Sequence, residues 1–136
     1  MKHLTIISLL ISLIAFSSTS SAQEKKDNLI IVSLTDSTKV YEKVTGLLKA
    51  EGYKLEKRLT NSEFVHTKAK TIGRYGNTLC FYSFKIAGNT ISISGQWHFD
   101  YSQNGKILND KSSFLPGWNE MDRLAKLLGT VTYAKK

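Results

Sequence analysis

The chain has 136 residues, with 19 Lys and Arg against 11 Asp and Glu, so its formal net charge at pH 7 is +8. Its single cysteine, Cys80, excludes an intramolecular disulfide and a zinc site built from several cysteines. A basic protein attracts anionic partners such as lipid headgroups, acidic glycans or nucleic acid, and net charge alone does not choose among them.

Residues 1–22 have the features of a secretory signal peptide. A basic start precedes the apolar run 4–16, which is too short to span a bilayer, and small residues then close with Ser20-Ser21-Ala22. We therefore expect a mature chain of residues 23–136 that forms a single domain without a transmembrane segment, in a secreted or periplasmic location.

The first elements of the mature chain are a strand and a helix. Residues 29–34 form an apolar run rich in branched side chains, which predicts a buried strand. Side-chain oxygens at 35–37 favour a helix cap, and apolar residues at helical spacing over 40–48 predict a helix. We expect this helix to end at Gly52.

Two further strands are predicted after this helix. Residues 53–59 alternate apolar with charged side chains, which is typical of a strand. Residues 63–70 indicate an edge strand. A tight turn at Asn61-Ser62 would place Leu59 beside Phe64, which suits both side chains, but it would also place Leu55 beside Lys68. The pairing of 63–70 therefore stays open.

A β-hairpin made of residues 78–86 and 91–101 is the clearest pattern in the chain. Joining the two strands through 87–90 separates an apolar face from a polar one, which predicts an amphipathic hairpin with its aromatic side turned inward. The predicted inward pairs are Ile86 with Ile91, Phe84 with Ile93, Tyr82 with Gly95 and Cys80 with Trp97; the outward pairs are Lys85 with Ser92, Ser83 with Ser94, Phe81 with Gln96 and Leu79 with His98.

The end of the chain predicts a turn, a helix and a tail. Asn104-Gly105 is typical of a two-residue hairpin turn leading to a short strand at 106–109, and Pro116-Gly117 closes the following loop. Apolar residues at helical spacing predict a helix at 118–128. The segment 130–136 is either a last strand or a disordered tail.

His98 and Asp100 are the residues that most resemble catalytic groups. Strand alternation places them on the polar face, where neighbours two apart are separated by roughly 6.6 Å of rise. Because a nucleophile and its base must come within about 3 Å, Ser94 does not reach His98 along a regular strand. Apart from the signal peptide, the chain has only His66 and His98, without a recognised metal-ligand spacing, so we expect neither a metal nor another cofactor.

Two surfaces are candidates for binding. The first lies on the polar face of the hairpin, where an aromatic and an apolar side chain stand among polar ones and form a recognition patch for a partner. The alternative is that the loop after Tyr101, with Ile107 and Phe114, folds across these side chains and buries them. The second is a diffuse basic zone. The first surface comprises Leu79, Phe81, Gln96, His98 and Asp100, and the second comprises Lys54, Lys57, Arg58, Lys68, Lys70 and Arg74.

The order of elements predicts an α+β two-layer sandwich, in which one mainly antiparallel, curved sheet packs two amphipathic helices on one face. The signal-peptide junction at 20–23, the strand at 29–34, the helix at 36–51, the hairpin at 81–97 and the late helix from Trp118 resemble small exported bacterial domains of unknown function with a TATA-binding-protein-like fold. The order of elements is also similar to that of the lipopolysaccharide-assembly lipoprotein of the outer membrane, although this chain lacks the lipidated cysteine. The resemblance implies the fold and transfers no functional residue.

These features favour a non-enzymatic binding module of the cell envelope. Its expected partner is an envelope component or a protein, with an anionic glycan or a lipid headgroup as the candidate ligands, and nucleic acid is not expected. Two alternatives remain open. One is a carrier that holds a small apolar ligand between sheet and helices, and the other is a small hydrolase that uses His98 and Asp100.

Overall fold

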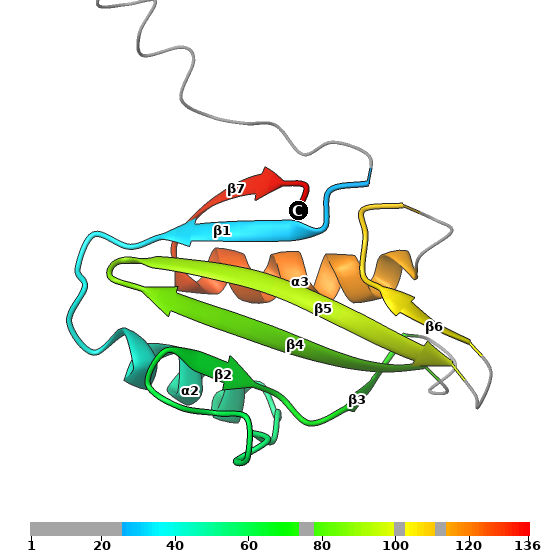
Figure 1. Ribbon diagram of the computed structural model, residues 1–136, viewed down its shortest axis with the longest axis horizontal. Helices are drawn as coiled ribbons and strands as arrows, with labels where there is room; N and C mark the ends of the chain where they lie inside the picture. Colours follow the sequence, from blue (N-terminus) through cyan, green and yellow to red (C-terminus); the bar gives the residue numbers. More distant parts are fainter. Residues whose placement is uncertain (1–25, 74–77, 100–102, 111–113) are drawn as a thin grey trace, which may run out of the picture.

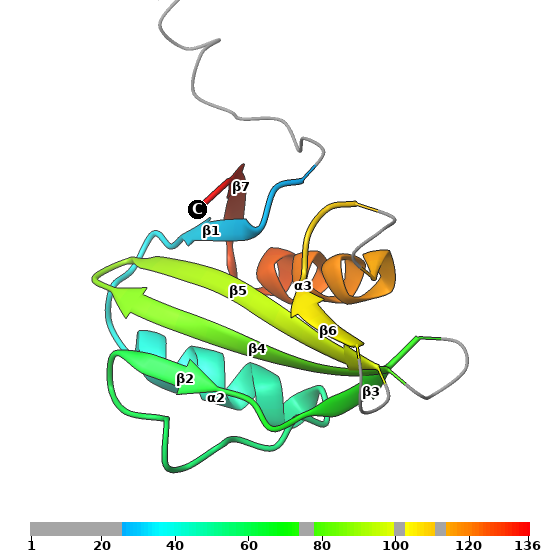
Figure 2. The ribbon, with the colours of Figure 1, turned by 45° about the vertical axis from the view of Figure 1, so that its right-hand side comes forward.

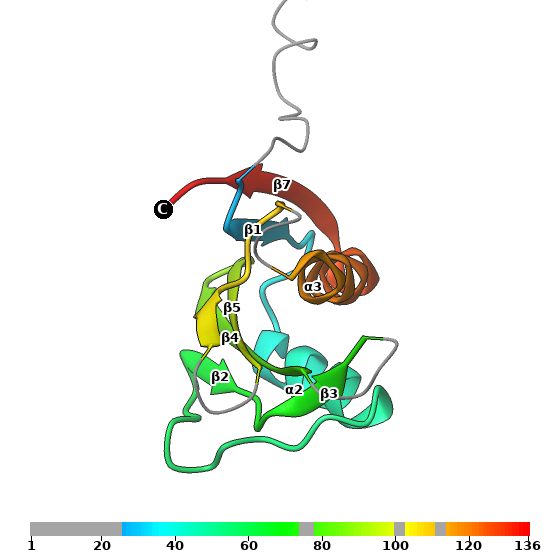
Figure 3. The same cartoon turned by 90° about the vertical axis from the view of Figure 1, so that its right-hand side faces the viewer.

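The computed structural model describes residues 26–73, 78–99, 103–110 and 114–136. The predicted signal peptide lies outside the described residues. In the described part, one antiparallel sheet of seven strands packs against two helices, α2 (Val40–Ala50) and α3 (Leu115–Leu128) (Figure 1). Figure 3 shows both helices on the inner side of the curved sheet, which confirms the predicted α+β two-layer architecture.

Two long strands, β4 and β5, form the centre of the sheet. The strand order is β2-β4-β5-β1-β7, and two further short strands extend it, since β3 also pairs with β4 and β6 also pairs with β5. Each long strand is therefore flanked by two short strands in line. The strands are β1 (Leu29–Ser33), β2 (Phe64–His66), β3 (Lys70–Ile72), β4 (Thr78–Ala87), β5 (Thr90–Phe99), β6 (Gln103–Lys106) and β7 (Thr130–Ala134).

The β4–β5 hairpin has the predicted register at every pair, from Ile86 opposite Ile91 to Leu79 opposite His98. Gly88, with φ +61°, supplies the left-handed conformation at its turn. Leu34 fixes the turn to the end of β1, because its N–H donates to the carbonyl of Asn89 and its carbonyl accepts from the Asn89 side chain.

The helix-covered face holds the apolar half of each central strand. Gly95 is necessary there, because a Cβ at this position would lie 2.8 Å from side-chain atoms of both Ile107 and Tyr82. This close approach explains why a glycine faces the Tyr82 ring across the hairpin. The largest fully buried side chains are Trp118, Tyr82, Phe84, Ile30, Leu48, Ile91, Ile93, Ile107, Met121, Leu124, Val32 and Val44.

Helix α2 begins later than its predicted cap. Asp36 accepts hydrogen bonds from the Thr38 backbone N–H at 2.9 Å and from its hydroxyl at 2.8 Å, so its carboxylate closes a turn before the helix. These two hydrogen bonds lower the pKa of Asp36. The residue that precedes the helix is Lys39, in the left-handed conformation, and the predicted cap is wrong. The helix ends near Gly52, with φ +82°, as predicted.

The segment predicted as a strand at 53–59 is irregular. Its only strand-like pairing in the described residues is an isolated bridge from Leu55 to Thr67. The predicted edge strand at 63–70 is two short strands, because the Thr67 hydroxyl accepts the Tyr82 N–H and interrupts the regular ladder between β2 and β3. The edge position is confirmed, since among the described strands both pair with β4 alone.

Two turn predictions near the end of the chain are wrong. Asn104 and Gly105 lie within β6, opposite His98 and Trp97, and a Cβ at Gly105 would lie 3.0 Å from the Trp97 indole nitrogen. The glycine there permits close packing and forms no turn. Pro116-Gly117 belongs to the first turn of α3, where proline is favoured.

The segment 130–136, predicted as either a last strand or a disordered tail, contains the strand β7, which pairs with β1.

Candidate binding groove on the open face of the sheet

The face of the sheet opposite the helices carries an open groove of about 1170 Å³. Figure 1 views the molecule from this side, with β4 and β5 in front of α3. The groove contains short polar side chains, one phenylalanine and several charged residues. Its lining residues are Asn28, Glu56, Leu59, His66, Thr67, Lys68, Ala69, Phe81, Tyr82, Ser83, Ser94, Gly95, Gln96, Lys106 and Lys136.

Strand pairing arranges the groove's polar groups in rows across the sheet. Ser83 of β4 lies directly opposite His66 of β2 on one side and opposite Ser94 of β5 on the other. In the neighbouring row, Gln96 of β5 lies between Phe81 of β4 and Lys106 of β6. Side chains directly opposite in an antiparallel sheet are about 5 Å apart, so the first row presents a contiguous polar surface, and the second row presents an aromatic ring beside an amide and an ammonium group.

His66 and Ser83 form the shortest contact between potential catalytic groups on this face. The His66 Nδ1 atom lies 2.9 Å from the Ser83 hydroxyl oxygen, which is the distance expected of a nucleophile and its base. Within the described residues, however, no carboxylate bonds to this ring, so the third member of a triad is missing there. Our sequence interpretation missed the pair because it left the pairing of 63–70 open.

Four of the five residues predicted as a patch on the hairpin lie together on the open face. Leu79 is 36% exposed, Phe81 and His98 are half-buried and Gln96 is exposed. Asp100 lies outside the described residues. His98 sits in a smaller depression of about 340 Å³, and none of the residues lining it is a serine.

The prediction that Ile107 covers this patch is wrong. Ile107 is fully buried, and its side chain packs against Gly95 and Gly117 on the helix-covered face. Since Ile107 follows directly after β6, the chain crosses the edge of the sheet at this point and leaves Leu79 and Phe81 to the open face.

The predicted basic zone contains a compact cluster. Lys54, Lys57 and Lys68 line a depression of about 520 Å³ together with Lys49, which the sequence interpretation had not included. Lys70 has a structural role instead, because its ammonium donates to the carbonyl of Glu51 at 2.8 Å and lies 4.3 Å from the centre of the Tyr53 ring. Of the remaining two predicted residues, Arg58 is exposed, and Arg74 lies outside the described residues.

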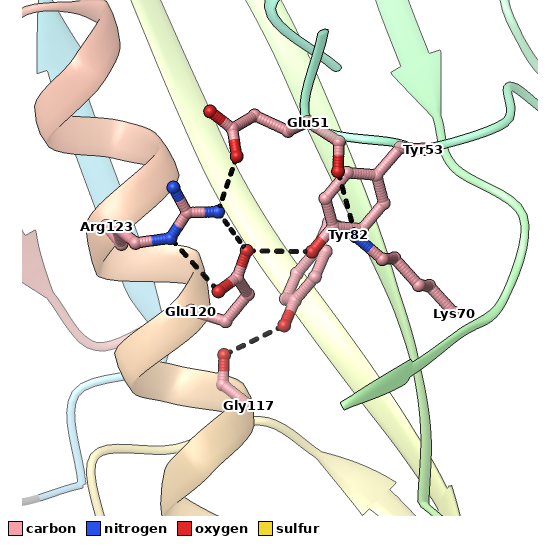
Figure 4. Close-up of polar contacts among 7 residues, drawn as sticks. All are labelled: Glu51, Tyr53, Lys70, Tyr82, Gly117, Glu120 and Arg123. Atoms are coloured by element: carbon pink, nitrogen blue, oxygen red, sulfur yellow. Dashed lines mark hydrogen bonds and ion pairs between the residues drawn. The ribbon is translucent and has the colours of Figure 1, made fainter. Parts of the chain in front are cut away.

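A second polar cluster lies on the helix side, where it joins the two helices (Figure 4). Glu120 of α3 accepts hydrogen bonds from the Tyr53 hydroxyl at 3.1 Å and from Arg123 at 2.6 Å. Arg123 also bonds to Glu51, just after α2, at 2.9 Å. Burial, together with the charge of Glu120, raises the pKa of Tyr53, so its phenol stays protonated. The arrangement ties helix α2 to α3 and offers no free base.

Cys80 and Tyr82 are buried beside this cluster. Burial raises the pKa of the Cys80 thiol to about 11 and also raises the pKa of Tyr82, whose hydroxyl donates to the carbonyl of Gly117 at 2.9 Å. A thiol that is buried and neutral at pH 7 is a poor nucleophile. Cys80 is therefore a core residue, as predicted.

The described residues contain no group of three or more His, Cys, Asp or Glu side chains that could hold a metal ion. Over the same ranges, neither helix has both the length and the apolar character that are needed to cross a membrane. Comparison of the chain with protein-family models, with curated proteins and with solved structures found no match in any of the three.

Proposed function

We propose that this chain is a non-enzymatic binding module of the cell envelope, secreted or periplasmic, which holds a polar partner in the groove on its open sheet face. The observation that supports the proposal is the groove itself, which runs over two long strands and is covered by neither of the two described helices. Phe81 is a half-buried aromatic residue on this face, and its ring offers a ligand an apolar contact beside the polar side chains.

The side chains of the groove suit an extended, hydroxyl-rich ligand that carries negative charge. Ser83, Ser94 and Gln96 donate and accept hydrogen bonds, and Phe81 offers an apolar surface beside them. Lys68, Lys106 and Lys136 also line the groove, and Glu56 is the acidic side chain among its described lining residues. An anionic glycan is the class of envelope component that fits this combination best.

The two alternatives receive less support. The hydrolase would require a serine near His98, whereas the histidine that contacts a serine is His66. The carrier would require space between sheet and helices, whereas added Cβ atoms at Gly95 and Gly117 would meet neighbouring side chains at 2.8 and 3.1 Å. Such close contacts are typical of a filled core.

The proposal can be tested by titrating isotope-labelled protein with a uronic-acid oligosaccharide and following backbone amide signals by NMR. We expect the largest shifts at Ser83, Ser94 and Gln96. Replacing Gln96 by Ala removes hydrogen bonds to the ligand, and replacing Phe81 by Ala removes its apolar contact, so each should weaken binding roughly tenfold.

The matched control is Leu127→Ser, which changes an exposed apolar residue on the opposite side of the molecule, in α3. Its affinity should equal that of the parent protein. Shifts centred on α3, or equal affinity in all three variants, would exclude the groove as the binding site.

A further inference from the structure

A second surface, the lysine pocket, lies at the edge of the molecule between α2 and β2. We define it by the residues that line the depression of about 520 Å³, namely Tyr41, Lys49, Tyr53, Lys54, Leu55, Lys57, Thr60 and Lys68. Four of these eight residues are lysines and none is acidic. In Figure 2 the chain that connects α2 with β2 lies at the bottom of the molecule, away from α3 and β7.

A backbone contact joins two of the four lysines of the pocket. The Lys68 N–H donates to the Lys54 carbonyl at 2.7 Å, beside the bridge between Leu55 and Thr67. These contacts bring two segments that are separated in sequence to the same place. Glu56, which follows directly after this bridge, lines the open-face groove and not the pocket. The fold therefore concentrates like charges at one place, which raises their mutual repulsion unless an anion binds there.

The turn at residues 57–59 adds an exposed apolar side chain beside these charges. Its backbone is closed by a hydrogen bond from the Leu59 N–H to the Glu56 carbonyl at 3.1 Å. Lys57, Arg58 and Leu59 are all exposed, and Leu59, at 59%, is the most exposed large hydrophobic residue in the described part of the chain. A basic surface with an apolar tip is typical of proteins that rest on a membrane interface.

Lysine rather than arginine lines the pocket, and the difference bears on the ligand. A lysine ammonium is a compact charge on a flexible stem, whereas arginine recognises one planar anion through a fixed pair of donors. Several flexible lysine ammonium groups suit the many phosphates of a headgroup layer better than they suit a single carboxylate. A soluble polyanion would use the lysines but would leave Leu59 in water. A ligand with an apolar layer behind its charges accounts for both observations.

We propose that the lysine pocket and the turn at 57–59 bind the surface of an anionic phospholipid bilayer. The pocket takes headgroup phosphate, and Leu59 enters the boundary between headgroups and acyl chains. Lys68 and Leu59 also line the groove, but the lysine pocket includes neither Phe81 nor Gln96. The glycan proposal is therefore tested at Phe81 and Gln96, and the bilayer proposal is tested at lysines that line the pocket alone.

Binding to vesicles tests this proposal. The chain used begins at Gln23, because the apolar run 4–16 would itself enter a bilayer and because every described helix and strand follows it. We expect it to sediment with vesicles of phosphatidylcholine containing about one third phosphatidylglycerol, and with pure phosphatidylcholine only weakly. Raising the salt concentration should release it, since exposed charges are screened.

The triple variant K49Q/K54Q/K57Q, which leaves the groove residue Lys68 in place, should lower the partition coefficient about a hundredfold, because each basic residue near an anionic surface contributes roughly a factor of five. Leu59→Ser should lower it about fivefold at every salt concentration. The matched control is K43Q/K126Q/K135Q, which removes the same charge from exposed lysines outside the pocket and should bind within about threefold of the parent protein.

Three results would overturn the proposal. Equal losses in the two triple variants would mean that net charge alone causes the binding, and an unchanged Leu59→Ser variant would mean that no apolar contact forms. Capture of soluble polyphosphate without any binding to anionic vesicles would assign the pocket to a soluble polyanion instead. None of these results bears on glycan binding at Gln96, which is measured separately.

Discussion

The two faces of the β4–β5 hairpin are built from alternate residues of the same strands, yet they differ in nearly every physical property. The face under the helices is apolar and packed so closely that glycines are needed where side chains meet. The open face carries serines, a glutamine and a histidine along a groove, with a half-buried phenylalanine among them. Strand alternation thus lets one face supply stability while the other remains available for recognition.

The comparison is tested most strongly by two phenylalanines of β4 that point to opposite faces. Phe84 is fully buried under the helices, so Phe84→Ala should lower the free energy of unfolding by about 3 to 5 kcal/mol. Phe81 is half-buried on the open face, and Phe81→Ala should cost about 1 kcal/mol or less while weakening ligand binding. Urea denaturation of both variants measures the difference. Similar losses of stability would mean that the open face also belongs to the core.

Alkaline pH should destabilise the covered face, where the neutral Cys80 thiol is buried. Because burial raises the pKa of Cys80 from 9.0 to about 11, the folded protein keeps a proton that the unfolded chain has already lost. The resulting stability is complete below pH 9 and disappears as the pH rises to 11, a loss of about 2 to 3 kcal/mol. The raised pKa values of Tyr53 and Tyr82 extend the loss to higher pH.

Denaturation curves between pH 8 and 11 measure this loss, and Cys80→Ala provides its control. The variant is less stable at pH 8 because it leaves a small cavity, but its stability should stay nearly constant up to the point where the tyrosines begin to ionise. A parent protein whose stability does not change between pH 9 and 11 would contradict the burial of a neutral thiol.

The sequence predicted those parts of the molecule whose signals are local. The alternation in β4 and β5 fixes which side chains pair, because a shift by one residue would turn every apolar side chain outward. The buried strand β1 and the stripe of α3 from Trp118 to Leu128 follow equally local patterns. For this reason Leu79, Phe81, Gln96 and His98 could be assigned to one face before their surroundings were known.

The remaining parts depend on contacts between distant segments. The Tyr82 N–H donates to the Thr67 hydroxyl where a regular ladder would offer it a backbone carbonyl, and this change of acceptor separates β2 from β3. No periodicity shows such an interruption in advance, so the contact between His66 and Ser83 was missed. An antiparallel match of 64–66 against 83–85 would have been the signal, because it places the two side chains directly opposite each other. The turn predicted at Asn104-Gly105 was wrong for a related reason, because a glycine can permit close packing between strands as well as form a turn.

Replacing a glycine by alanine adds a single methyl group, so it tests whether a position is closely packed or open. A Cβ at Gly129 would lie 2.7 Å from the carbonyl oxygen of Ser33 and 3.0 Å from the Leu34 side chain, at the point where α3 leads into β7. Because moving the Ser33 backbone away from the added methyl group would strain the sheet, Gly129→Ala should lower the free energy of unfolding by roughly 1 to 3 kcal/mol.

Gly46 is the matched opposite, because it lies within α2 and a Cβ there would meet nothing within 4 Å. Gly46→Ala should raise the free energy of unfolding by about 1 kcal/mol, through the higher helix propensity of alanine. Thermal or urea denaturation of the two variants measures both changes, and their opposite signs are the diagnostic result. If Gly129→Ala were as stable as Gly46→Ala, the junction between α3 and β7 would have to be looser than the contact with Ser33 implies, and the covered face would end before this strand.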